Sequence, residues 1–500
     1  MHHFSFILLG CLCLSVPSFA QESLRPPNIL FLLADDLGYG DLGCFGQKKI
    51  RTPRLDQLAS EGMRLTKHYA GSNVCAPSRC VFMTGLHTGH TYIRDNQQAK
   101  GFAEGQEPVP AGYLKLPVLL KKQGYVIGGF GKWGLGPFGS TGDPLKQGFD
   151  RWFGYNCQAV AHNYYPTHLW NNDLQMQLDN PKMLAHQKFP VNGDPQDPSQ
   201  YQRYQGKDYA PDLIVDQALA FITENKHRPF FLYFATPVPH LALQVPEDSL
   251  QEYRNQFNDE PYLGNRSYLP HRYPRAAYAA MITRMDRDMG RLLDRLKELK
   301  LDQNTIVVFT SDNGPLYNRL GGTDADYFAS AAGMRGRKGS FYEGGFRVPC
   351  IVRWPGHIAP SSTSDRVTGF EDWLPTLLDL IGAQAEIPTD LDGMSFAPTL
   401  RRQKQEPRPF LYRESPGYGG QQSIRAGQWK AMRRNLNPSP GANNQQPGEL
   451  ELYDLNQDPQ ESRNVAKEHP EIVQRLQTML DEQHTPSALF PMKLLDTAKK

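Results

Sequence analysis

Residues 75 to 85 read Cys-Ala-Pro-Ser-Arg-Cys-Val-Phe-Met-Thr-Gly, so a thiol and a guanidinium lie four positions apart. Proline is favoured in the first turn of a helix, and a helix that begins at Pro77 puts Arg79 on the same face as Cys75. A thiol near its ordinary pKa has no obvious use for a guanidinium unless both hold an anion. The spacing therefore predicts a site that binds an anionic group.

Two pairs of oxygen-bearing side chains add to this chemistry. Each pair directly follows an apolar run, and the pairs are Asp35-Asp36 and Asp312-Asn313. By itself, Asp-Asp-x-Gly is more typical of a turn than of a metal site. Carboxylate and amide oxygens are, however, the ligands that Ca²⁺ and Mg²⁺ prefer. Four such side chains at two strand ends indicate a site for a hard divalent cation.

The elements that must position these residues can be read from the apolar pattern. Buried strands of a parallel sheet are predicted at Asn28–Ala34, Tyr125–Phe130, Pro229–Ala235, Thr305–Ser311 and Arg347–Arg353. Helices are predicted from the Thr52-Pro53 cap to Gly62, and over Asp212–Asn225 and Tyr273–Lys300. The alternation predicts a doubly wound α/β domain, in which ligands bind at the carboxyl ends of the strands.

The pattern changes beyond Pro407. Short antiparallel strands are predicted at Phe410–Arg413, Gln422–Arg425, Trp429–Arg433 and Glu449–Asp454, and a closing helix at Pro470–Gln483. We therefore expect a large catalytic α/β domain over 24–405 and a small C-terminal α+β subdomain over 406–500. The polar composition of 166–208 predicts a long loop, and 435–448 predicts an exposed hairpin loop.

Composition and the N-terminus bound the class of protein. The 500-residue chain has a net charge of +2 and no Lys/Arg-rich run, so no nucleic-acid partner is expected. Residues 1–20 read as a secretory signal peptide with a small-x-small end, although no Lys or Arg precedes the apolar run. That run is too short to span a membrane, and no other segment approaches the required length. We expect export to the periplasm or the medium, because residues 8–11 form only a poor lipoprotein box.

The run 75–85 resembles the signature of the type I sulfatases, C-x-P-S-R-x-x-x-x-T-G. The matching residues are Cys75, Pro77, Ser78, Arg79, Thr84 and Gly85. The resemblance implies an alkaline-phosphatase-like α/β sandwich with a large mixed, mostly parallel sheet. It also implies that a maturation enzyme oxidises Cys75 to formylglycine, an aldehyde that hydrates. One hydroxyl of the hydrate attacks the sulfur of a sulfate ester, and the other later collapses to expel sulfate.

The same resemblance gives the acidic pairs a role. Their flanks, residues 38–43 and 310–314, also look like family segments. The resemblance implies one metal ion, with Ca²⁺ preferred over Mg²⁺, held by Asp35, Asp36, Asp312 and Asn313. The ion would hold sulfate oxygens and favour the ionised hydrate. If Cys75 is converted, the sequence leaves open none, one or two disulfides among Cys44, Cys80, Cys157 and Cys350.

Three further positions match family residues in motifs that follow predicted strands. Lys132 and Lys338 would contact the sulfate, and Lys338 would also assist the leaving oxygen. His240 matches the histidine that protonates the leaving alkoxide, a task suited to a group that titrates near neutral pH. Solvated lysines and a structural histidine are the ordinary alternatives, and the motif context favours catalysis.

One position departs from the family pattern. The family reads Gly-Lys-Trp-His-Leu-Gly, and Gly134 stands where the histidine that assists the hydrate is expected. His90 and His162 are the candidates to replace it, and we favour His162 because it lies in the aromatic- and amide-rich run 157–165. Such a run is equally suited to binding a sugar, so His162 is assigned to substrate binding and the replacement stays open.

The leading hypothesis is a secreted sulfatase that removes sulfate from a carbohydrate. The variant at Gly134 and the run 161–165 resemble bacterial enzymes that desulfate polysaccharides. This resemblance implies sulfated galactose or N-acetylgalactosamine as the substrate, without fixing the hydroxyl or an exo or endo action. A phosphomonoesterase or phosphodiesterase on the same scaffold is one alternative, although those enzymes typically use Ser or Thr with two zinc ions. An arylsulfatase of broad specificity and a non-catalytic glycan-binding relative are the others.

Overall fold

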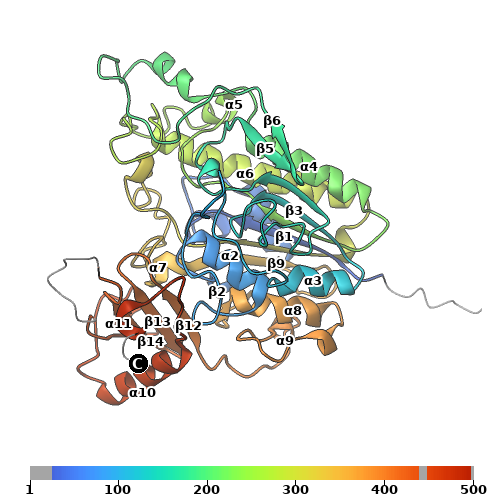
Figure 1. Cartoon of the computed structure of the whole chain (residues 1–500), viewed down its shortest axis with the longest axis vertical. Helices are drawn as coiled ribbons and strands as arrows, with labels where there is room; N and C mark the ends of the chain where they lie inside the picture. Colours follow the sequence, from blue (N-terminus) through green and yellow to red (C-terminus); the bar gives the residue numbers. More distant parts are fainter. Residues whose placement is uncertain (1–24, 439–447, 497–500) are drawn as a thin grey trace, which may run out of the picture.

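The computed structural model describes residues 25–438 and 448–496. The predicted signal peptide, residues 1–20, and most of the predicted hairpin loop over 435–448 lie outside the described residues. The described chain contains a large sheet of eleven strands and a separate sheet of four strands, which lies at the lower left of Figure 1. The predicted combination of a large α/β sheet and a small antiparallel sheet is therefore confirmed.

The strand order in the large sheet is β10-β2-β9-β8-β1-β7-β3-β4-β5-β6, and β11 also pairs with β2. The strands are β1 Asn28–Ala34, β2 Met63–Tyr69, β3 Val126–Lys132, β4 Arg151–Tyr155, β5 His168–Asn171, β6 Leu174–Gln177, β7 Phe230–Ala235, β8 Thr305–Ser311, β9 Arg347–Arg353, β10 Ser362–Ser364 and β11 Thr368–Gly369. The central strands β8, β1, β7, β3 and β4 are parallel. All residues of β1 and β8 are buried, as their unbroken apolar sequences predict.

Two predictions about this sheet are wrong. β9 has the predicted bounds but runs antiparallel to both β8 and β2. Because β9 is almost as fully buried as the parallel strands β1 and β8, its sequence carries no sign of its direction. The segment 166–208 is not one long loop, since it contains the β5–β6 hairpin and a 3₁₀ helix at Pro198–Tyr204.

Helices cover both faces of the large sheet (Figure 1). They are α1 Pro53–Glu61, α2 Cys75–Thr84, α3 Lys115–Lys122, α4 Ala210–Glu224, α5 Glu247–Leu250, α6 Pro274–Glu298, α7 Glu343–Phe346, α8 Trp373–Leu380 and α9 Ala397–Leu400, with α10 Pro470–Gln483 and α11 Lys493–Asp496 nearer the C-terminus. Alternate side chains of β1 enter two hydrophobic cores. Phe31 belongs to the core that includes residues of α2, α3 and α8, and Leu32 to the core that includes residues of α4 and α6.

The small sheet is antiparallel, in the order β12-β13-β14-β15. Its strands are β12 Leu411–Ser415, β13 Gln421–Ala426, β14 Trp429–Arg434 and β15 Glu451–Asp454, close to the predicted ranges. Helix α10 has the predicted bounds and packs on β13 and β14. Leu476 and Leu480 of α10 form a small apolar core with Tyr412 and Ile424 of the sheet.

Buried ion pairs hold the small sheet to the rest of the chain. Arg413 of β12 lies 2.7 Å from Glu371, which belongs to the segment before α8, and both side chains are at most 1 % exposed. Lys430 of β14 lies 3.0 Å from Glu343 of α7, and these side chains are equally buried. Removing one partner of such a pair leaves an uncompensated charge in the interior, which is strongly destabilising.

We predict that Arg413→Ala lowers the free energy of unfolding by about 3–5 kcal/mol, because Glu371 would keep only Arg408 as a buried ionic partner. The matched control is Arg434→Ala, which removes an ion pair with Glu451 whose arginine side chain is 46 % exposed. That change should cost no more than about 1 kcal/mol. Urea unfolding of both variants measures the difference, and equal losses would show that the Arg413 pair does not hold the small sheet.

Candidate active site

The first site residues lie where β1 and β8 end. The two strands are parallel neighbours, with Ala34 paired to Ser311, so the residues that follow meet at one edge of the sheet. The backbone N–H of Asp36 donates to Asp312 Oδ1 at 3.2 Å. The residues brought together here are each at most 1 % exposed, and they are Asp35, Asp36, Asp312 and Asn313.

These four residues fit a hard divalent cation. Asn313 Nδ2 donates to Asp36 Oδ1 at 2.7 Å, whereas the buried Asn313 Oδ1 has no hydrogen-bond partner among the described residues. A buried amide oxygen without a partner is costly, and a bound cation would satisfy it. Three carboxylates and an amide oxygen are also a donor set that Ca²⁺ accepts.

Cys75 lies beside these ligands at the start of α2. The helix begins at Cys75 itself, two residues earlier than predicted. Cys75 Sγ lies 3.3 Å from Lys338 Nζ and 3.6 Å from Lys132 Nζ. It also lies 3.4 Å from Asp35 Oδ1. Two ammonium groups therefore flank the position of the thiol, where they would stabilise negative charge on any group placed there.

Arg79 lies one turn further along α2 and is 1 % exposed. Its Nε and Nη2 donate to Asp312 Oδ2 at 3.1 and 2.8 Å, and Nη2 also lies 3.4 Å from Asp35 Oδ2. Its Nη1 donates to the carbonyl oxygen of Lys132. Arg79 and Cys75 thus share Asp35 as a neighbour, which agrees with the helical spacing of the two residues.

Each lysine at the site is paired with a carboxylate. Lys132, the last residue of β3, places Nζ 2.5 Å from Asp35 Oδ2. Lys338 precedes α7 and places Nζ 2.7 Å from Asp36 Oδ1. These contacts raise the pKa of both lysines although burial opposes the charge, so both are ammonium groups.

The carboxyl and thiol groups respond to the same neighbours. Burial raises the pKa of Asp36 and raises that of Asp312 to about 6. Burial would also raise the pKa of Asp35, but Lys132 and the other basic side chains around it hold it well below its ordinary value. Burial, together with Asp35, raises the pKa of the Cys75 thiol to about 12. Asp35 is therefore the most firmly ionised carboxylate of the site.

His240 completes the group on the side of Asp36. Its Nδ1 lies 2.7 Å from the carbonyl oxygen of Leu241, and its Nε2 lies 3.5 Å from Asp36 Oδ2. Because a carbonyl oxygen only accepts, Nδ1 carries a proton and Nε2 is the nitrogen directed at the site. Burial, followed by Lys338 and Lys132, lowers the pKa of His240 well below its ordinary value.

The two histidines considered as replacements at Gly134 lie in different places. The ring of His162 stacks on His240, with centroids 4.9 Å apart and an angle of 9° between the planes. His90 instead pairs with Asp392 through Nδ1 at 2.9 Å. His162 is therefore part of the site, whereas the described contacts of His90 lie outside it.

The space beside Gly134 is filled by Gln158. Gly134 has a φ of +102°, and a Cβ built on it would lie 2.4 Å from Gln158 Nε2. Gln158 is 5 % exposed, its backbone N–H donates to Gln106 Oε1, and its Nε2 has no hydrogen-bond partner among the described residues. The chemistry of the run 157–165 pointed to His162. The Gln158 amide in the same run was missed because it does not titrate.

We predict that Gly134→His destabilises the protein, because its Cβ would overlap the Gln158 amide and the backbone is left-handed. Adding Gln158→Gly removes the overlap. The double variant should therefore lose about 0.5–3 kcal/mol less unfolding free energy than the sum of the two single variants. Gly139→His is the matched control, since Gly139 also has a positive φ but nothing lies within 4 Å of the position that its Cβ would take. Strictly additive losses of unfolding free energy at positions 134 and 158 would contradict the claim that the two side chains occupy the same space.

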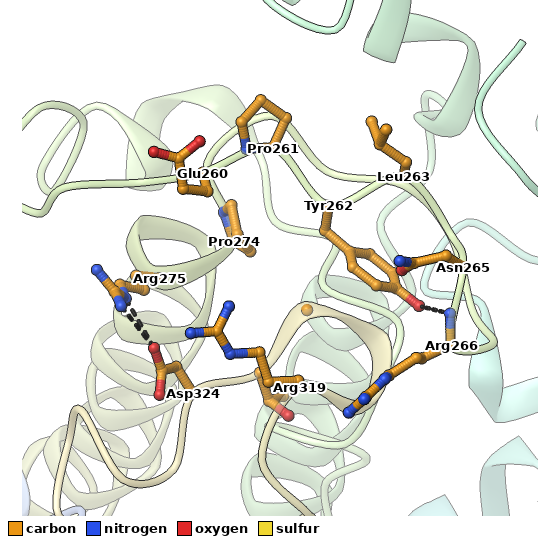
Figure 2. A pocket seen from close by; sticks show the side chains of 12 residues that line it. Glu260, Pro261, Tyr262, Leu263, Asn265, Arg266, Pro274, Arg275, Arg319 and Asp324 are labelled. Carbon is orange, nitrogen blue, oxygen red and sulfur yellow. Dashed lines mark hydrogen bonds and ion pairs between the residues drawn. The ribbon is translucent and has the colours of Figure 1, made fainter. Parts of the chain in front are cut away.

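A cavity of about 380 Å³ is lined by other residues (Figure 2). Arg266, Arg275 and Arg319 are among its lining residues, and Arg275 forms an ion pair with Asp324 at 2.7 Å. None of the predicted site residues lines this cavity. It is therefore not the candidate active site.

Two wider properties bear on the class of protein. The five cysteines of the described chain are all free, which settles the disulfide question among them. Within residues 25–438 and 448–496, no helix is both long and apolar enough to cross a membrane.

The chain matches known families and proteins over most of its length. The family model described as Sulfatase matches residues 27–383, and one described as N-sulphoglucosamine sulphohydrolase, C-terminal, matches residues 337–486. The chain is 31 % identical to human N-acetylgalactosamine-6-sulfatase, over 79 % of this chain and 69 % of the relative. It is 29 % identical to N-acetylgalactosamine-6-O-sulfatase of Bacteroides thetaiotaomicron, over 96 % of this chain and 97 % of the relative.

A solved structure is similar over nearly the whole chain. It is Ps i-CgsB in complex with k-i-k-neocarrahexaose, which is 25 % identical, has a TM-score of 0.71 and covers 95 % of this chain and 96 % of its own. The fold is thus the alkaline-phosphatase-like fold that the resemblance implied. The chain belongs to the type I sulfatase family. It is an enzyme that hydrolyses sulfate esters.

Proposed function

We propose that this sulfatase is exported and removes sulfate from galactose or N-acetylgalactosamine units of a carbohydrate, through a formylglycine formed from Cys75. The observation that carries the proposal is the setting of Cys75 Sγ, which has the ammonium groups of Lys338 and Lys132 at 3.3 and 3.6 Å. The four-oxygen cluster lies directly beside it. This setting suits an anionic group on residue 75 and a sulfate ester in contact with it.

The modification at residue 75 would be made by a maturation enzyme. Sγ marks the place of the aldehyde oxygen. Hydration of the aldehyde supplies two hydroxyls on one carbon, of which one accepts the sulfuryl group and the other allows its release. Arg79, held by Asp35 and Asp312, keeps positive charge beneath this position. Lys132 would add a second positive charge and would contact a sulfate oxygen.

Protonation of the leaving oxygen is assigned to His240 and Lys338. His240 directs Nε2 into the site, and its Nδ1 contact with Leu241 fixes the orientation of the ring. Burial and, after it, the two lysines lower the pKa of His240. An anionic substrate would oppose the effect of the lysines and favour the protonated imidazole ring. His162, stacked on that ring, is assigned to substrate binding.

The metal is proposed to be one Ca²⁺. Asp35, Asp36, Asp312 and Asn313 would hold it, and the unpartnered Asn313 Oδ1 supports this assignment. When bound, the ion polarises the sulfate group and favours the ionised nucleophile. Ca²⁺ is preferred over Mg²⁺ because it tolerates irregular oxygen cages.

The substrate class rests on the relatives and on the site together. Two relatives are an N-acetylgalactosamine-6-sulfatase and an N-acetylgalactosamine-6-O-sulfatase, and the similar solved structure is a complex with k-i-k-neocarrahexaose. Export is supported by the apolar, small-x-small segment 1–20. A phosphoesterase is disfavoured because those enzymes typically carry Ser or Thr and two zinc ions where this chain has Cys75 and one hard-oxygen cluster.

We predict that the matured enzyme releases sulfate from 4-O- or 6-O-sulfated galactose or N-acetylgalactosamine faster than it releases phosphate from the matching phosphate esters. Cys75→Ala should lower turnover by about 10⁴–10⁶-fold, the scale seen when a nucleophile is removed. Ion chromatography of released sulfate and phosphate measures both.

Cys75→Ser tests the same chemistry more sharply. A single hydroxyl could accept the sulfuryl group but could not expel it, so at most one turnover per enzyme is expected. Sustained turnover by this variant, or a preference for the phosphate esters, would refute the proposal. An aryl sulfate cleaved faster than every sulfated sugar would favour the arylsulfatase of broad specificity.

For the metal, we expect chelation to abolish activity and Ca²⁺ to restore it better than Zn²⁺. Asp312→Ala should lose both the ion and the activity, because one carboxylate leaves a small ligand set. Asp365→Ala, which changes an aspartate whose side chain is 82 % exposed, is the matched control and should keep both. Elemental analysis reads the bound ion independently of turnover, and a metal-free wild-type enzyme with full activity would overturn the assignment.

A further inference from the structure

Two exposed tyrosines from distant segments lie against each other. Tyr317 is 41 % exposed and Tyr418 is 56 % exposed, which places both among the large exposed apolar side chains of the described chain. Their ring centroids lie 6.4 Å apart, at an angle of 39°. Neighbouring exposed aromatic rings present an apolar surface with polar tips, a combination that suits a ligand with both characters.

The pair lies next to the group around Cys75. The Tyr418 ring packs on Gly339, since a Cβ on that glycine would lie 2.6 Å from the ring. The residue before it, Lys338, places Nζ 3.3 Å from Cys75 Sγ. Burial raises the pKa of the Tyr418 hydroxyl, and the charge of Lys338 opposes that shift.

The turn that carries Tyr418 is anchored beside the start of α2. It connects β12 to β13, and a Cβ on its Gly417 would lie 2.6 Å from Asp95 Oδ2. The next residue, Asn96, accepts a hydrogen bond from the backbone N–H of Ala76 at 3.0 Å. The small sheet thus extends a turn over the residue that follows Cys75.

Tyr418 has a strained backbone conformation. It has a φ of +53°, a conformation that favours glycine and costs a bulky residue about 1–3 kcal/mol. The neighbouring Gly419 and Gly420 adopt positive φ values without that cost. A tyrosine that is both strained and exposed contributes little to the fold, which points to a ligand as the reason for its presence.

The tyrosines border a cavity of about 510 Å³, within the range of about 300–1,000 Å³ typical of ligand sites. Arg335, Arg337 and Arg434 also line it, and two of them have ion-pair partners, Asp326 for Arg337 and Glu451 for Arg434. Gly339, which directly follows Lys338 in the chain, also lines this cavity.

We propose that Tyr317 and Tyr418 form a sugar-binding platform, on which the ring that carries the sulfate ester stacks by its apolar C–H face. The inference rests on the proposed function, because the stacked ring is the alcohol that leaves when sulfate is removed. In a galacto-configured ring the axial hydroxyl at carbon 4 leaves the opposite face largely apolar, and that face matches an aromatic surface. Lys338, between the platform and Cys75, would then face the oxygen that joins sugar and sulfur.

The test compares KM values on a sulfated galactoside or N-acetylgalactosaminide. Tyr418→Ala and Tyr317→Ala should each raise KM about 10-fold with little change in kcat, since they remove contacts made before and during the reaction. Tyr418→Phe keeps the ring and should restore a near wild-type KM. Inorganic sulfate, used as a competitive inhibitor without a sugar, should bind all variants equally.

Controls separate this inference from the function on which it rests. Arg319→Ala changes the separate cavity of Figure 2 and should leave KM unchanged, as should Leu174→Ala on an exposed edge strand. If the wild-type enzyme hydrolyses no sulfated sugar, the proposed function fails. If the wild-type enzyme does and the alanine variants share its KM, or if Tyr418→Phe behaves like Tyr418→Ala, the platform alone is wrong.

Discussion

The site depends on burying three carboxylates against three cations at the end of one sheet. The charged groups, each at most 8 % exposed, are Asp35, Asp36 and Asp312 with Arg79, Lys132 and Lys338. Burying one of these charges alone would cost several kcal/mol, so each needs its partner in place. The cations come from α2, from the end of β3 and from the loop before α7. Their pairing therefore fixes a helix, a strand and a loop around Cys75 at once.

This balance also frames the chemistry. The side chains sum to no net charge, so a divalent cation would add two positive charges to the site. A sulfate ester and a developing oxyanion on residue 75 would supply the matching negative charge, which explains why such a site would favour sulfate transfer. The small sheet contributes because its β12–β13 turn reaches this centre, and its buried Arg413 and Lys430 pairs hold it there.

Local sequence signals predicted most of this arrangement. The bounds of β1, β8 and β9 follow from runs rich in apolar and β-branched residues, and the cluster at Asp35 follows from polar residues at strand ends. The direction of β9 was not predictable, because burial on both faces gives parallel and antiparallel strands the same pattern. Gln158 and Tyr418 were missed for a related reason. Their positions at the site depend on contacts with Gly134 and Gly339, which lie at a distance in the chain.

The central claim is that residue 75 works as a formylglycine and not as a cysteine. The most direct measurement is the mass of the peptide that contains residue 75, taken from protein made with and without a maturation enzyme, beside the specific activity of each preparation. We predict that the fraction of peptide carrying an aldehyde rises in proportion to activity. This aldehyde should also react with hydrazides. Full activity in protein whose peptide retains only the thiol would contradict it.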